Sequence, residues 1–87
     1  MLNKNITDQK INEKIIKFFS EKLKISEGNI SLNAHLKDEL GIDSVETMEI
    51  VAALEQEFAI KVPEEELAKI ETVQNIIQAI TKATNIS

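Results

Sequence analysis

The sequence contains no cysteine. This absence excludes disulfide bonds and thiolate metal sites, and it fits a protein of a reducing compartment. It also limits the chemistry of the chain, because any reaction that needs a thiol has to take it from a group attached to the protein.

Catalytic side chains are equally scarce. The chain has one histidine, His35, and neither tyrosine nor tryptophan, so a nucleophile would find few bases beside it. A hydrolase-type serine needs glycine two residues further on, and Ser44 is followed there by Glu46. His35 has no second histidine or cysteine with which to share a metal, and the acids of residues 38–43 do not follow the calcium-loop pattern. We expect a loop position near the surface for His35, no metal site and no enzymatic activity.

Long hydrophobic runs are also missing. Apolar stretches such as Ile50 to Leu54 are far too short to span a bilayer, and residues 1–10 are polar and lack the apolar core of a signal peptide. We therefore expect a soluble cytoplasmic protein without membrane insertion.

The residues that are abundant favour helices. Hydrophobic residues make up 43% of the chain, only three residues are aromatic, and Ala, Leu, Ile, Glu, Lys and Gln are frequent. With 87 residues, the chain is long enough for one domain with a modest core. The composition predicts a single all-α domain over residues 1–87, and we expect a monomer.

Charge is distributed unevenly. The net charge is −5; residues 1–42 hold seven lysines and six acids, net +1, whereas residues 43–87 hold three lysines and nine acids, net −6. The acidic half would be repelled by a phosphate backbone, so we expect no nucleic-acid partner and a partner with a basic protein surface. The alternative is that the acids serve only solubility.

The first half of the chain predicts one helix and a long loop. Residues 1–6 are polar and are expected to be frayed, and Thr7 can cap a helix that ends near Lys24. Residues 25–43 contain both glycines and several polar residues, so they predict a loop. This loop keeps four apolar anchors, namely Ile30, Leu32, Leu36 and Leu40. Loops of this length are more often functional than idle.

The second half predicts three helices. Asp43 and Glu46 have the spacing of a reciprocal capping box, and the helix they begin is expected to end near Phe58. Pro63 suits the start of a short third helix that reaches about Ile70, and Thr72 can cap the last helix. The expected apolar residues of the second and last helices are Val51, Leu54, Phe58, Val73, Ile76, Ile77 and Ile80. We expect the end of the chain, residues 83–87, to fray. The predicted fold is a four-helix bundle with a short third helix and a long first loop.

Ser44 is the residue best placed for chemistry. If Asp43 is the cap, Ser44 is the first helical residue, and its hydroxyl faces solvent beside free amides and the positive helix end. A phosphodiester would be favourable there. The alternative is that Ser44 is itself the capping residue and has no further role.

Four segments carry a resemblance to a known family. LGIDSVETMEIV (40–51), ALEQEF (53–58), IKVP (60–63) and IETV (70–73) together resemble the acyl carrier proteins. The resemblance covers nearly the whole chain and implies that a transferase attaches 4′-phosphopantetheine from coenzyme A to Ser44 through a phosphodiester. It also implies that the terminal sulfur of the arm carries acyl groups as thioesters, which explains the missing cysteine.

The resemblance further implies two sets of binding residues. Partner enzymes with basic docking patches, which transfer acyl groups or elongate chains, would contact Asp43, Val45, Glu46, Met48, Glu49 and Glu55. An acyl chain would be enclosed by Leu36, Val51, Leu54, Leu67 and Ile70.

The chain departs from the family at one position. The family usually has leucine where this chain has Val45, which changes the shape offered to partner enzymes. This change favours a specialised pathway, such as polyketide or modified fatty acid assembly, over housekeeping fatty acid synthesis. A peptidyl or D-alanyl carrier and, from a different class, an unmodified helical interaction module are the alternatives.

Overall fold

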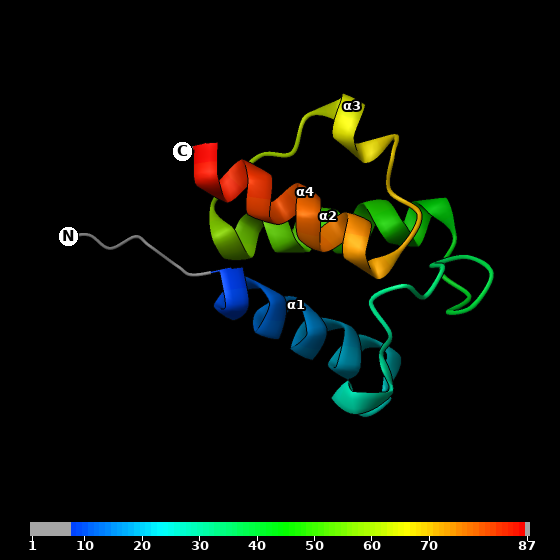
Figure 1. Ribbon diagram of the computed structural model, residues 1–87. Coiled ribbons are helices and arrows are strands. Elements are labelled where there is room, and N and C mark those ends of the chain that lie inside the picture. The colour runs from blue at the N-terminus through cyan, green and yellow to red at the C-terminus, as the bar shows by residue number, and fades with distance from the viewer. Residues whose placement is uncertain (1–7, 87) are drawn as a thin grey trace. The chain divides into compact units, whose positions relative to one another are not determined.

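The computed structural model describes residues 8–86 (Figure 1). Within them lie four α-helices, which are α1 (Asp8–Leu23), α2 (Ser44–Phe58), α3 (Glu64–Leu67) and α4 (Val73–Ile86), and one 3-10 helix, η1 (Glu27–Asn29). The same residues contain no strand, only an isolated bridge between His35 and Thr72. The predicted all-α fold with a short third helix is therefore confirmed. The chain divides into two units at Ile30 and Ser31, and each is described by itself.

The first unit is built on α1. Ile11, Ile15 and Phe19 follow one another at intervals of four residues and are completely buried, which is the spacing of one helix face. The helix ends at Leu23, close to the predicted position, and Lys24 has a left-handed backbone with φ of 59°. The Ile25 N–H then donates to the Ser20 carbonyl at 3.2 Å, which completes a common form of helix ending. The predicted cap Thr7 and the expected frayed start, residues 1–6, lie outside the described residues.

The second unit is organised around α2 and α4, which are in contact and lie side by side (Figure 1). Both helices bury the residues that their periodicity predicts, with Phe58 half-buried at the end of α2. The buried set is Ile50, Val51 and Leu54 on α2, and Val73, Ile76, Ile77 and Ile80 on α4. These seven apolar side chains supply the hydrophobic stabilisation of the two helices.

The two ends of α4 show one confirmed and one wrong prediction. Thr72 caps the helix as predicted, since its hydroxyl accepts from Asn75 N at 3.1 Å and the Asn75 side chain accepts from Thr72 N at 3.0 Å. The expected fraying after Lys82 is wrong, because α4 continues to Ile86. The reason is that Ala83 is buried and extends the apolar stripe three residues beyond Ile80.

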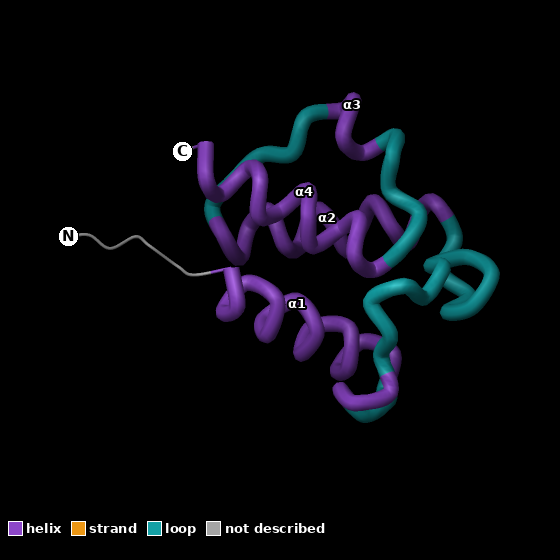
Figure 2. The backbone as a smooth tube through the Cα atoms, in the orientation of Figure 1, coloured by secondary structure: helices purple, strands orange, loops and turns teal. Residues whose placement is uncertain are grey.

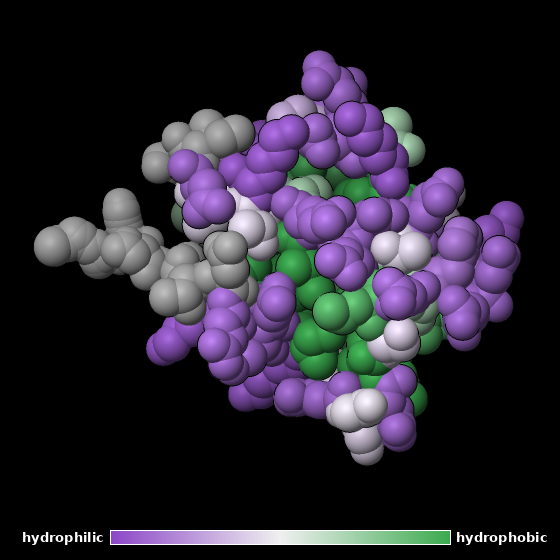
Figure 3. All heavy atoms as spheres, viewed as in Figure 1, coloured by the Kyte–Doolittle hydropathy of each residue, from purple (hydrophilic) through white to green (hydrophobic). Residues whose placement is uncertain are grey.

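The short helix α3 covers less of the chain than predicted. It spans four residues, with Pro63 as an N-cap that makes no side-chain capping bond. After Leu67 the backbone closes tighter turns, because Lys69 N donates to Glu66 O and Ile70 N donates to Leu67 O. These bonds span three residues rather than four, so the α-helix stops before Ile70. None of the α3 residues is buried, and hydrophilic side chains cover this part of the face shown in Figure 3.

The segment 31–43 runs as a loop into α2 (Figure 2). Three backbone hydrogen bonds attach it to the start of α4: Leu36 N to Glu71 O at 2.9 Å, Val73 N to Ala34 O at 3.2 Å, and Gln74 N to Leu32 O at 2.9 Å. Of the expected anchors, Ile30 and Leu36 are buried, Leu40 is half-buried, and Leu32 is 38% exposed, so the prediction was wrong for Leu32. No helix in residues 8–86 has the length and apolar character needed to cross a membrane.

Candidate functional site

The start of α2 is fixed by a reciprocal pair of hydrogen bonds. Asp43 Oδ1 accepts from Glu46 N at 2.8 Å, and Glu46 Oε1 accepts from Asp43 N at 3.2 Å. The predicted capping box is therefore confirmed, with Asp43 as the N-cap. A box of this kind satisfies two backbone N–H groups that have no partner within the helix.

Ser44 is consequently the first residue of α2 and not its cap. Its side chain is exposed, and the hydroxyl makes no hydrogen bond to any of the residues 8–86. It lies beside the N–H groups of the first turn, at the positive end of a helix of 15 residues. The interpretation of Ser44 as a capping serine is wrong, and its hydroxyl is free to react.

The residues before Ser44 hold it in place. Gly41 has φ of +70°, a left-handed conformation that is costly for residues with a Cβ. Ile42 is buried, and its N–H donates to the Leu36 carbonyl at 2.8 Å. The Leu36 N–H in turn donates to the Glu71 carbonyl, just before α4. Backbone hydrogen bonds therefore link the residues before Ser44 to the start of α4. Ile42 was not predicted as an anchor, although its apolar side chain between Gly41 and Asp43 was a usable signal.

The two apolar residues predicted to meet partners are exposed. Val45 is 65% and Met48 47% exposed. Among the described residues, Leu32 is the other large hydrophobic residue that is exposed. Single exposed apolar side chains are common on protein surfaces, so their exposure makes them available for contacts but does not assign a partner. That they contact partner enzymes stays a prediction.

The four carboxylates of the predicted recognition set are in different situations. Asp43 and Glu46 form the capping box, and Glu49 is exposed without a hydrogen bond or ion pair among residues 8–86. Glu55 is half-buried, and its Oε2 accepts from Val62 N at 2.7 Å. This bond ties α2 to the connection before α3, across the left-handed residue Ala59. This role of Glu55 was not predicted from the sequence, because the bond depends on how the chain turns after α2.

The five residues of the predicted acyl pocket lie in the second unit. Leu36, Val51 and Leu54 are buried, whereas Leu67 and Ile70 are half-buried. Leu67, at the end of α3, and Ile70, three residues later, are therefore the more accessible members of the set. Their role in enclosing an acyl chain stays a prediction.

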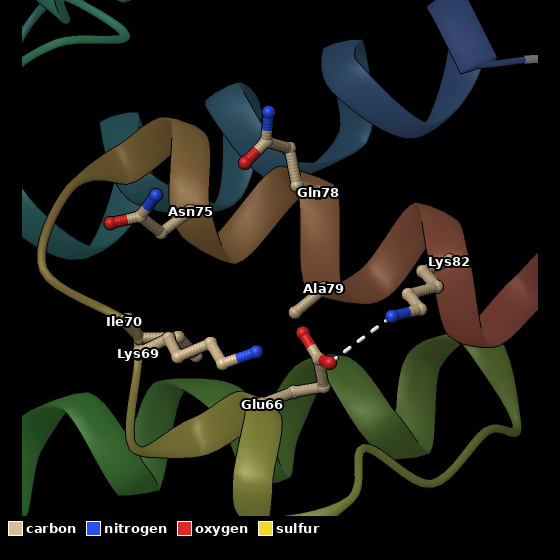
Figure 4. A pocket seen from close by; sticks show the side chains of 7 residues that line it. All are labelled: Glu66, Lys69, Ile70, Asn75, Gln78, Ala79 and Lys82. Atoms are coloured by element: carbon tan, nitrogen blue, oxygen red, sulfur yellow. Dashed lines mark hydrogen bonds and ion pairs between the residues drawn. The ribbon is translucent and has the colours of Figure 1, made fainter.

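A surface pocket of about 280 Å³ lies between the α3 region and α4 (Figure 4). Of the predicted acyl-pocket residues, only Ile70 lines it, and most of its other lining residues are polar. Lys82 Nζ lies 3.1 Å from Glu66 Oε2 across this pocket. Its charged and amide side chains do not suit an alkyl chain, so this pocket is not the apolar cavity that the resemblance implies.

His35 holds the loop together. Its side chain is 38% exposed, and Nδ1 lies 3.6 Å from Asp38 Oδ2. Its backbone N–H donates to Glu39 Oε1 at 2.6 Å. Residues 8–86 contain no group of three or more His, Cys, Asp or Glu arranged to hold a metal ion.

Comparison with known proteins identifies the family. Residues 13–80 match the family described as phosphopantetheine attachment site, which is well over half of the 87 residues. The chain belongs to this family. Its fold is similar to the crystal structure of an acyl carrier protein from Thermotoga maritima, with a TM-score of 0.74 and 28% sequence identity over 91% of this chain and 92% of that chain.

Membership in the phosphopantetheine attachment site family settles three predictions. The chain is a carrier protein and not an enzyme, its prosthetic group is 4′-phosphopantetheine, and a phosphopantetheinyl transferase adds that group. The alternative of an unmodified helical interaction module is wrong. The start of α2 fits such a group, because an exposed, unbonded hydroxyl meets the amides and positive end of a helix. The carboxylates that flank Ser44 in sequence, Asp43 and Glu46, each accept from a backbone N–H of the capping box.

The capping box leads to a first prediction. Asp43→Ala should lower the free energy of unfolding by about 1 kcal/mol, within about 0.5–2, because Glu46 N loses its acceptor. Asp43→Asn should cost much less, since asparagine caps helices about as well as aspartate. Urea unfolding followed by circular dichroism measures both variants. Equal losses for the two would show that the cap contributes through charge alone.

Proposed function

We propose that this protein is an acyl carrier protein that bears 4′-phosphopantetheine on Ser44 and presents acyl intermediates to enzymes of fatty acid or polyketide-type synthesis. The observation that carries the proposal is the state of Ser44: Asp43 supplies the cap, so the serine hydroxyl is exposed and unbonded. Attachment joins Ser44 Oγ to the phosphorus of the phosphopantetheinyl group, while the nucleotide part of coenzyme A leaves and the transferase takes the serine proton.

The bound group would supply the thiol that the chain lacks, and acyl groups would be carried on it as thioesters. The chain itself contributes position and recognition. The capping box and the buried Ile42 fix the backbone on both sides of Asp43. The exposed Val45 and Met48 lie within the first two turns after Ser44, where an enzyme that works on the cargo must approach.

For the cargo itself, we propose the interior lined by Leu36, Val51, Leu54, Leu67 and Ile70. Its support is the contrast between its two sides: the side chains from α2 and the loop are buried, whereas Leu67 and Ile70 are half-buried. The α3 side is the one that can move at least cost, because α3 has four residues, no buried residue and no side-chain cap.

The choice of pathway rests on two features. The similar Thermotoga maritima protein is an acyl carrier protein, which supports acyl cargo over the alternative of a peptidyl or D-alanyl carrier. Val45 in place of the usual leucine supports a specialised set of partners, since a β-branched, shorter side chain offers a different shape.

We propose a cytoplasmic monomer, in keeping with the absence of cysteine and with only three large hydrophobic residues exposed in the described part of the chain.

The test is direct. The purified protein is incubated with coenzyme A and a phosphopantetheinyl transferase of broad specificity, and its intact mass is measured, followed by peptide mapping. A single added phosphopantetheine on the peptide that contains Ser44 is the expected result. Addition at another residue would refute the site, and a folded chain that gains no mass would refute the proposal as a whole.

A further inference from the structure

The pocket between the α3 region and α4 gathers positive charge in the acidic half of the chain. Residues 43–87 hold three lysines and nine acids, and two of these lysines, Lys69 and Lys82, line this pocket of about 280 Å³. Among the described residues that line it, Glu66 is the one acid, so the lining has a net charge of +1. The positive charge of this half is therefore concentrated at one place, where it can attract an anion.

The structure already places a carboxylate between the two lysines. Lys82 Nζ lies 3.1 Å from Glu66 Oε2, and the Lys69 side chain points toward the same carboxylate from the other side (Figure 4). Lys69 makes no hydrogen bond or ion pair within residues 8–86, so its ammonium donors are unused there. The Glu66 carboxylate therefore marks where the carboxylate of a ligand would be bound.

Glu66 can give up this position at low cost. It belongs to α3, a helix of four residues with no buried residue and no side-chain cap. Its partner Lys82 has a side chain that is 63% exposed, and ion pairs with exposed partners are weak. Ile70 and Ala79 line the same pocket and offer apolar surface to the carbon chain of a ligand. A carboxylate on such a chain would gain contacts that offset the loss of the internal ion pair.

We propose that this pocket is a carboxylate-binding site in which Lys69 and Lys82 hold the carboxylate of the ligand and Glu66 is its internal competitor. The group that is recognised is a carboxylate on a short carbon chain, whether it belongs to a free organic acid or to a glutamate or aspartate of an acidic peptide. Binding forms no covalent bond, and it exchanges one carboxylate for another beside Lys82.

Titration of the full-length protein with glutarate at constant ionic strength tests this site. Glutaramide has the same carbon chain without the charges and is the matched control. Backbone amide shifts of Lys69, Ala79 and Lys82, measured by NMR, should saturate at millimolar glutarate and should not respond to glutaramide.

Four substitutions test the role of each charge. Lys69→Gln and Lys82→Gln should each weaken glutarate binding about threefold, whereas Glu66→Gln should strengthen it about threefold because the competitor loses its charge. Lys61→Gln is the matched control, since Lys61 is exposed, is the third lysine of this half and does not line the pocket. It should change the affinity less than about 1.5-fold. Circular dichroism verifies that each variant is folded.

Three outcomes would overturn the proposal. They are a wild-type protein that does not distinguish glutarate from glutaramide, a Lys61→Gln variant that loses as much affinity as Lys69→Gln, and a Glu66→Gln variant whose affinity is not raised. None of these measurements involves loading of Ser44, and no residue of α2 lines the pocket, so their failure leaves the proposed function untouched.

The source of the carboxylate is determined with a short peptide that has one central glutamate and no other charge. Tighter binding of this peptide than of glutarate would assign the site to an acidic peptide. Tighter binding of glutarate would assign it to a free organic acid. Both results require the site, and Lys82→Gln should weaken the binding of either ligand.

Discussion

Replacing Ser44 by alanine should abolish loading completely and leave the fold almost unchanged. The hydroxyl makes no hydrogen bond within the described residues, and alanine is a good helix former at an exposed first position. The intact mass after incubation with coenzyme A and transferase should therefore stay that of the unmodified chain. The circular dichroism spectrum and the urea midpoint should match the wild type.

Ser26→Ala is the matched control for this experiment. Ser26 is also exposed and precedes a helical segment, η1, as its N-cap, and its side chain makes no capping bond. Its substitution should leave loading at the wild-type level. A Ser44→Ala protein that still gained one phosphopantetheine would move the attachment point to another hydroxyl, and peptide mapping would locate it.

Leu54→Ala should destabilise the protein far more than the loss of the cap at Asp43. Leu54 is 1% exposed on the face of α2 that packs in the second unit, so the substitution removes buried methyl groups and leaves a cavity, at a cost of about 2–5 kcal/mol. Small domains have a total stability of about 5–15 kcal/mol, so much of the margin would be lost. Urea unfolding followed by circular dichroism measures the change.

Leu67→Ala provides the comparison, because the chemical change is the same and the environment is not. Leu67 is half-buried on α3, a helix without any buried residue. We expect a cost below about 1.5 kcal/mol, since water and neighbouring side chains can fill the space that is left. If both variants lost the same stability, α3 would be as firmly packed as α2, and the proposed movable side of the cargo space would have to be given up.

The parts of the fold that could be predicted are those decided by local sequence. The cap at Asp43, the cap at Thr72 and the buried stripe of α4 depend on residues three or four positions apart, and all three are confirmed. The same local pattern predicted that Asp43 is the N-cap and that Ser44 is the first residue of the helix. Family membership followed from short segments spread over the whole chain.

Predictions that depend on contacts distant in sequence were less successful. The end of α4 was placed too early, because the burial of Ala83 depends on what surrounds the last turn. The length of α3 was overestimated for a related reason, since its glutamates favour a helix start but no buried residue holds the last turn. The bond from Glu55 to Val62 could not be predicted, because it exists only after the chain reverses at Ala59.

The segment 31–43 is attached to the start of α4 by hydrogen bonds between backbone groups. The use of backbone and not side-chain atoms in these bonds has a consequence for how the protein can evolve. Bonds between backbone N–H and carbonyl groups persist when side chains are exchanged, and the side chains of Leu32, Asn33 and Lys37 are exposed and make no hydrogen bond within residues 8–86. Mutation can therefore alter the surface of this loop without displacing the helix that begins at Ser44. A lineage of such proteins can acquire new partners while the residue that bears the cofactor stays in register with the rest of its unit.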